Sequence, residues 1–113
     1  MTERNLNLIR GTVDLLILTA LSDGEQHGYA VSEWIQGATE GTLLVEEGTL
    51  YPALHRLEAK GWIEAEWGLS ENNRKAKYYA LTPSGRARLR HEEEAWDRYS
   101  AAVAKALARG PAT

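Results

Sequence analysis

The stretch EEGTLYPALHRLEAKG, residues 46–61, predicts a helix whose two sides differ in character. At 100° per residue Leu50, Leu54 and Leu57 fall within about 60° of one another, so they can face a core. Pro52 is compatible with the first turn, where backbone N–H groups lack intrahelical acceptors, and Gly61 ends the helix. The opposite side is expected to be small near its start and basic further on, and it consists of Thr49, Pro52, Ala53, Arg56 and Lys60. This side is either a solvated surface or a surface for a partner.

The composition limits the class of protein. With 113 residues the chain is long enough for one domain with a modest core. It contains no cysteine, which excludes disulfides and thiolate metal sites. No signal-peptide pattern is present, and the longest apolar run, residues 13–21, is interrupted by Asp14 and Thr19. That run is also shorter than the roughly 20 residues of a membrane span. We therefore expect a soluble, cytoplasmic protein with no membrane partner.

The net charge of −3 conceals a basic segment. Residues 1–55 carry two basic and eight acidic side chains, whereas residues 56–90 carry eight basic and four acidic ones. Nucleic-acid binding depends on the local field at the contact surface more than on the total charge. The charge distribution therefore permits nucleic-acid binding by the segment that begins at Arg56.

The order of the expected elements predicts the fold. They are a helix at 8–21, a helix at 27–38, a short strand at 41–45, the helix at 46–61, strands at 62–69 and 75–81 around a turn at 70–74, and a helix from 83 to about 109. Thr82 and Pro83 form a strong start signal for the last helix, which would be on the order of 40 Å long. This order is typical of a winged helix-turn-helix, a mostly α fold with a small β-hairpin wing. We expect a DNA-binding domain over 1–82, a dimerisation helix over 83–109 and a flexible tail over 110–113.

The winged fold gives the basic segment a function. The third helix of such a fold lies in the major groove of DNA, and the wing contacts the backbone beside it. A groove about 12 Å wide favours small side chains at the closest approach and long cationic ones at the flanks. The helix at 46–61 has both, with Lys60 as its last cation, and the expected wing tip carries Asn72, Asn73, Arg74, Lys75 and Lys77. A partner surface for double-stranded DNA is therefore favoured over a solvated side.

Three segments resemble the PadR family of bacterial transcriptional regulators: HGYAVSEWI (27–35), EEGTLYPALHRLEAKGWI (46–63) and RKAKYYALTPSGR (74–86). The resemblance covers roughly residues 8–108 and is to the short branch, in which one helix follows the winged domain. It implies a homodimer that binds a two-fold-related operator, usually as a repressor, and leaves DNA on a ligand or stress signal. It also implies DNA contacts by Thr49, Tyr51, Pro52, Arg56, Arg74, Lys75 and Lys77. By projection Tyr51 lies between the two sides of its helix, where it packs, contacts phosphate, or does both.

The last helix carries an apolar stripe that predicts a dimer interface. Trp96, Tyr99, Val103 and Ala106 recur at intervals of 3, 4 and 3 residues, and Leu89 lies one heptad before Trp96. On a helix longer than its own domain, such a stripe needs a partner surface. The first helix, which includes Leu15 and Leu18, is apolar on two sides. We expect it to pack on its own core with one side and on the last helix of the partner chain with the other. The alternative is that the stripe folds back on the first helix of the same chain.

Trp96 also suggests a ligand site. In the multidrug-sensing branch of the family that the chain resembles, a tryptophan at the matching place lines a central pore for flat aromatic ligands. Leu15 and Trp96 would then bind an aromatic effector, and Glu92 and Glu93 nearby would favour a cationic one. A plain interface tryptophan is the favoured interpretation.

Enzymatic chemistry has little support in the sequence. His91 and Glu94 lie one helical turn apart, but no third metal ligand is evident, so a solvated acidic surface is favoured. We therefore expect no enzyme, no cofactor and no metal site. The alternative to a DNA-binding regulator is a winged-helix module for protein–protein contact without sequence-specific DNA binding, which the acidic first half would allow.

Overall fold

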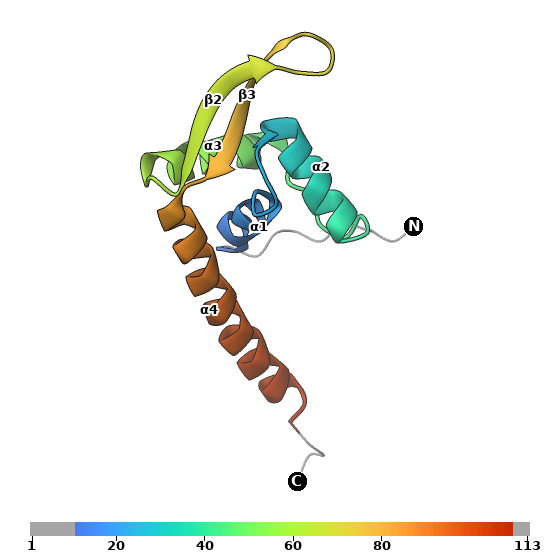
Figure 1. The fold of residues 1–113 in the computed structure, drawn as a ribbon. Coiled ribbons are helices and arrows are strands. Elements are labelled where there is room, and N and C mark those ends of the chain that lie inside the picture. Colours follow the sequence, from blue (N-terminus) through green and yellow to red (C-terminus); the bar gives the residue numbers. More distant parts are fainter. Residues whose placement is uncertain (1–10, 110–113) are drawn as a thin grey trace.

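The computed structural model describes residues 11–109 as four helices and a three-stranded antiparallel sheet (Figure 1). In chain order the elements are α1 (Thr12–Ala20), β1 (Gln26–His27), α2 (Gly28–Ala38), α3 (Glu47–Ala59), β2 (Ile63–Leu69), β3 (Lys75–Leu81) and α4 (Pro83–Leu107). The expected class, a mostly α winged helix-turn-helix with a long C-terminal helix, is confirmed. The start of the first expected helix, at 8–10, and the expected tail at 110–113 lie outside the described residues.

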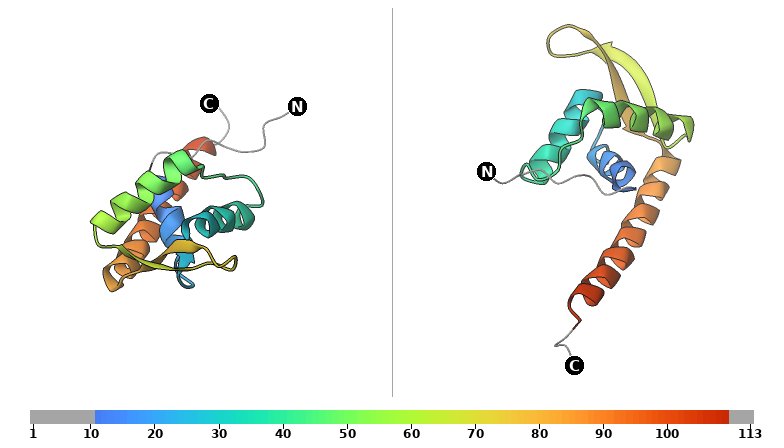
Figure 2. Two further views of the ribbon diagram at one scale, coloured as in Figure 1. Left: turned by 90° about the horizontal axis from the view of Figure 1, so that it is seen from above. Right: turned by 180° about the vertical axis from the view of Figure 1, so that it is seen from behind.

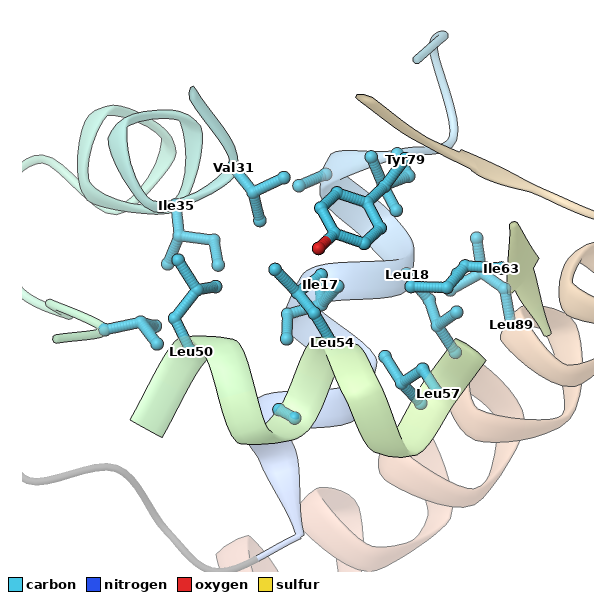
Figure 3. Close-up of a cluster of buried hydrophobic side chains, with 14 residues drawn as sticks. Ile17, Leu18, Val31, Ile35, Leu50, Leu54, Leu57, Ile63, Tyr79 and Leu89 are labelled. Atoms are coloured by element: carbon cyan, nitrogen blue, oxygen red, sulfur yellow. The ribbon is translucent and has the colours of Figure 1, made fainter. Parts of the chain in front are cut away.

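The core is centred on α1, which packs against α2, α3 and α4 (Figure 3). Ile17 and Leu18 are completely buried there, which explains why the first helix is apolar almost all round. The three leucines of α3 pack onto α1 as their spacing predicted, and each is at most 1% exposed. The other elements complete the core with Val31, Ile35, Ile63, Tyr79 and Leu89. The side of α3 that faces inward is therefore firmly held, and its other side is left at the surface.

The sheet has the strand order β1-β3-β2, so the third strand comes from a different place than predicted. It lies at Gln26–His27, where Gln26 pairs with Tyr79, and not at 41–45. The segment before α3 instead turns through Glu40 and Gly41, which have positive φ angles of 53° and 81°. The hydroxyl of Thr39 then accepts a hydrogen bond from the backbone N–H of Leu43 (3.1 Å). Local side-chain bonding thus shapes this segment, in which Leu43 forms an isolated β-bridge and residues 41–45 form no strand.

The first turn of α4 is bound tightly to the start of β2. Thr82 caps the helix by accepting from the backbone N–H of Gly85 (3.0 Å), and its hydroxyl donates to the carbonyl of Gly61 (2.6 Å). The hydroxyl of Ser84 donates to the same carbonyl (3.0 Å). A Cβ on Gly85 would lie only 1.8 Å from the carbonyl oxygen of Trp62, so the two backbones are in direct contact. The root of α4 and the root of the wing therefore form one rigid junction.

Beyond this junction α4 extends away from the winged domain (Figures 1 and 2). Its 25 residues include only two buried ones, Gly85 and Leu89, both in the first two turns. The C-terminal half makes a projecting arm whose side chains are mostly exposed. Neither α4 nor any other helix within residues 11–109 is long and apolar enough to cross a membrane.

Candidate nucleic-acid interface

The outward side of α3 is a ridge formed by Gly48, Pro52, His55 and Ala59. All four are exposed, and they project opposite to the buried residues of the helix, Leu50, Ala53, Leu54 and Leu57. The expectation that Ala53 belongs to the exposed side is wrong, because this residue is 1% exposed. Thr49 and Arg56 lie on one flank of the ridge and Tyr51 on the other.

Of the ridge residues only Pro52 was predicted from the sequence, and His55 is the one polar side chain among the three that were not. The three leucines alone do not place His55 opposite the buried side of α3. When Ala53 is added, the buried side becomes wider and its centre moves, so that His55 projects from the opposite side of the helix. The side chain of His55 lies next to that of Tyr51 at the edge of the wing pocket described below. A ridge of small residues with a single imidazole leaves the helix backbone accessible to a closely approaching partner.

Tyr51 packs against the beginning of α2. A Cβ on Gly28 would lie 2.8 Å from Cε1 and 2.9 Å from the hydroxyl of Tyr51, so the ring occupies the space that a side chain at Gly28 would need. The residue nevertheless remains 36% exposed. Of the alternatives left open by the sequence, packing is therefore observed, and the exposed part of the ring remains accessible to a partner.

The two faces of the wing, the hairpin of β2 and β3, carry opposite charges. Trp67 pairs with Lys77 and Leu69 with Lys75, so these side chains share the face that also holds Ile63. Glu64 and Glu66 alternate with them and project from the other face. The basic face is the one that meets α3, since Lys77 Nζ lies 3.9 Å from a carboxylate oxygen of Glu58.

In the sequence, Ile63, Ala65 and Trp67 alternate with Glu64 and Glu66, which predicts a strand with one buried face. Trp67 is nevertheless 61% exposed. The strand continues past the end of the core, so the alternation that buries Ile63 places Trp67 on the same face but beyond the buried residues. The ammonium groups of Lys75 and Lys77 lie 5.5 and 6.0 Å from the centroid of the Trp67 ring. Cations at this distance are attracted to the face of the indole. The exposed indole thus helps to hold the two lysines on the basic face.

A pocket with a volume of about 440 Å³ lies between α3, the start of α2 and the wing, and it is called the wing pocket. It is lined by residues from all three, among them His27, Tyr29, Tyr51, His55, Trp67, Lys75, Lys77 and Tyr79. Burial raises the pKa of the Tyr79 phenol above its usual value of 10.0, and the nearby Glu58 and Tyr51 add to this effect. Tyr79 therefore stays neutral at physiological pH, and the formal charge contributed by the wing to this surface is that of its lysines.

The other predicted cations have different surroundings. Arg56 forms an ion pair with Asp14 of α1. Lys60 lies over the ring of Trp62, 4.9 Å from its centroid. Asn73 and Arg74 are exposed at the tip of the wing, where Asn73 has a positive φ angle of 61°. The structure thus brings Tyr51, Lys75 and Lys77 together around the wing pocket, with Pro52 on the neighbouring ridge. Thr49, Arg56 and Lys60 lie on the opposite flank of α3.

A second concave surface, the α1–α4 groove, lies on the side of the domain away from the wing. It encloses about 450 Å³ and is lined by Gly11, Thr12, Leu15, Glu92, Ala95, Trp96 and Tyr99. The two residues predicted to bind a ligand, Leu15 and Trp96, are thus brought together. The rings of Trp96 and Tyr99 are 6.2 Å apart and tilted by 35°. The groove therefore presents two aromatic surfaces and one carboxylate.

The predicted dimer interface divides into exposed and buried members. Trp96, Tyr99 and Val103 are 37%, 62% and 39% exposed, and Ala106 is exposed as well. These four residues are called the α4 stripe below. Leu18 and Leu89, by contrast, are buried in the core of their own chain, at 0% and 8% exposure. In the single chain these two residues therefore leave almost no surface for a partner, because α1 and the first turns of α4 pack on each other.

The helix-turn-helix with its wing and a ridge on the third helix defines a class of DNA-binding regulators. Residues 17–91 match the model of the Transcriptional regulator PadR-like family. This match spans more than half of the chain, which therefore belongs to the PadR-like family. The resemblance stated from the motifs is confirmed.

Individual relatives agree with this assignment. A transcriptional regulator of Mycobacterium tuberculosis is 39% identical over 87 residues, which cover 76% of this chain and 77% of the relative. The solved structure of a transcriptional regulator from Clostridium thermocellum has a TM-score of 0.78 at 35% identity and covers 86% of this chain and 94% of that one. A PadR family regulator from Eggerthella lenta has a TM-score of 0.74 at 34% identity, over 89% and 86% of the two chains. The protein is a transcriptional regulator and not an enzyme.

Proposed function

We propose that this protein is a homodimeric, cytoplasmic repressor that binds a two-fold-related DNA operator and releases it when an effector occupies the α1–α4 groove. One observation carries the proposal of DNA contact: the lysines of the basic wing face line the same pocket as His55, which stands on the ridge of α3. The carboxylates of Glu64 and Glu66 project away from it. The membership in a family of transcriptional regulators supports the same role.

In the proposed complex the ridge of α3 enters the major groove. Thr49, Pro52 and His55 would then approach the base edges, since they leave the helix backbone closest to the groove floor. Lys75, Lys77 and Arg74 on the wing would neutralise phosphates beside it, and Tyr51 would contact the backbone at the edge of the ridge. Arg56 and Lys60 would extend this surface along the flank of α3.

The proposed dimer forms through the arm of α4. The α4 stripe leaves apolar side chains exposed on a helix that projects beyond its own domain, and a second copy of the chain would cover them. Two-fold DNA recognition requires the α3 helices of the dimer to lie about 34 Å apart, one turn of the duplex. The rigid junction at Gly85 would keep this spacing fixed relative to α4.

The proposed effector is a flat aromatic cation. The α1–α4 groove has the size of small-molecule sites, which span about 300–1,000 Å³. Trp96 and Tyr99 would stack on an aromatic ring, and Glu92 would pair with its positive charge. An effector that changes the angle between the two α4 helices of the dimer would change the distance between its two winged domains. The effector can shift the equilibrium between a DNA-binding spacing and a released spacing of the two winged domains only by the difference between its affinities for these two states.

The wing lysines provide the test of the DNA-binding surface. Lys75→Ala and Lys77→Ala are each expected to weaken binding to all duplexes alike. Each is also expected to reduce the steepness of the slope of log K against log salt by about 1. Fluorescence anisotropy of two labelled duplexes, one from upstream of the protein's own gene and one of scrambled sequence, at several salt concentrations, measures both. Glu66→Gln on the opposite face of the wing is the matched control and is expected to change the slope little. Wild-type binding that is absent or insensitive to salt would favour the protein–protein module instead.

A further inference from the structure

Arg56, one of the residues expected to contact DNA, is held by a carboxylate from another helix. Its Nη2 donates a hydrogen bond to Oδ1 of Asp14, a residue of α1 that lies 42 positions earlier in the chain. The side chain of Arg56 is 47% exposed and that of Asp14 is 23% exposed. The pair is thus at the surface, where the guanidinium has access to both the carboxylate and an approaching partner.

The position of the pair relates it to the DNA-binding surface. Arg56 lies one turn after Pro52 on α3 and about 40° around the helix from it, on the side of α1. It therefore borders the ridge of α3 from the side opposite to Tyr51 and the wing. A guanidinium at this position is within reach of the edge of a groove that the ridge enters, and of the phosphates that line that groove.

The chemistry of the pair separates these two targets. A guanidinium has five N–H donors in a rigid fork, so it can hold a carboxylate through one edge and present another edge to a second acceptor. The O6 and N7 atoms of guanine are neutral acceptors that fit such an edge. A phosphate is an anion, so it competes with Asp14 for the positive charge and is repelled by the carboxylate. Asp14 thus disfavours a phosphate as the second acceptor and permits a guanine.

We propose that Asp14 is a specificity-determining residue that holds Arg56 for a base and withholds it from phosphates. This inference rests on the proposed DNA-binding function and adds a positioning residue outside the helix-turn-helix motif to it. Asp14 reduces binding to random DNA, where only phosphate contacts are made, and leaves binding to the operator almost unchanged. The carboxylate therefore acts on the ratio of the two affinities.

The test compares Asp14→Asn with the wild-type chain on two probes. One probe is a duplex selected from a random library by the wild-type protein, and the other is a duplex of scrambled sequence. In Asp14→Asn the released Arg56 is expected to take one more phosphate on the scrambled duplex, which steepens the slope of log K against log salt by about 0.9. The preference for the selected duplex is expected to fall about tenfold. Asp14→Glu is expected to retain most of that preference.

Arg56 decides whether the effect passes through the ion pair. In an Arg56→Ala background, Asp14→Asn is expected to change neither the slope nor the preference. Asp23→Asn, which removes an exposed carboxylate from the loop after α1, measures the effect of a charge change alone. An equal change of slope in Asp23→Asn, or in the Arg56→Ala background, would overturn the inference. So would an unchanged preference in Asp14→Asn.

Two further outcomes are separated by the same measurements. If Asp14→Asn lowers the thermal midpoint of unfolding and weakens binding to both duplexes by the same factor, the ion pair has a structural role and the inference is wrong. If the wild-type protein selects no sequence at all, the proposed function itself fails. If it selects a sequence but Asp14→Asn discriminates equally well, only the present inference fails.

Discussion

Replacing Gly85 with alanine is expected to lower the free energy of unfolding by about 3 kcal/mol. A methyl group at this position would lie 1.8 Å from the carbonyl oxygen of Trp62. Because that oxygen belongs to the backbone, no change of rotamer relieves the overlap, and α4 has to move away from β2. The movement would also lengthen the hydrogen bonds of Thr82 and Ser84 to Gly61. Urea unfolding followed by tryptophan fluorescence measures the loss.

Gly37→Ala is the matched control for this substitution. Gly37 lies within α2, and no atom is found within 4 Å of a Cβ added to it. Alanine is favoured over glycine in a helix by roughly 0.5–1 kcal/mol, so this variant is expected to be slightly more stable than the wild type. A Gly85→Ala variant as stable as the wild-type protein would show that the junction between α4 and the wing can relax.

A charge in the middle of the α4 stripe is expected to abolish the proposed dimer. Val103 is 39% exposed in the single chain, so Val103→Glu does not disturb the core, but it would place a carboxylate in an apolar interface. A monomer binds one operator half-site at a time. It lacks the second winged domain, which in the dimer is held close to the other half-site at a high effective concentration. Operator affinity is expected to fall at least about 100-fold. Sedimentation velocity and operator binding measure the two consequences.

Ala101→Glu introduces the same charge two residues away and controls for it. Ala101 is exposed and projects roughly opposite the α4 stripe, so this variant is expected to remain a dimer with near-normal operator affinity. The far-UV circular dichroism of both variants is expected to match the wild type. A Val103→Glu protein that sediments as a dimer would show that the stripe is not the interface.

The class of fold could be predicted from the sequence because its signals are local. The leucines of α3 repeat at helical spacing, strands β2 and β3 alternate around a polar turn, and Thr82 with Pro83 marks the start of α4. Each of these signals involves neighbours in the chain, so no knowledge of the tertiary structure is needed. The motifs around Tyr51 and Thr82 were also sufficient to suggest the family.

The errors concern positions where the extent of the core decides the outcome. Ala53 is buried because the core covers more of α3 than the leucine arc, and Trp67 is exposed because the core ends before the strand does. Leu18 is enclosed by its own chain for a related reason: periodicity cannot tell which apolar side faces a partner. The pairing of Arg56 with Asp14 joins two helices, and no local pattern in either one predicts it.

The opposite charges on the two faces of the wing have a consequence for the speed of association. A protein with a uniformly distributed charge of −3 would be repelled by a duplex in every orientation. With Lys75 and Lys77 on one face and Glu64 and Glu66 on the other, the molecule instead carries a local electric dipole. In the proposed complex the field of the phosphates would turn this dipole during diffusion, so that the protein would arrive with the ridge of α3 already directed at the grooves. At 0.1 M salt the field is screened over about 10 Å, and this orientation is therefore achieved only in the last steps of the approach.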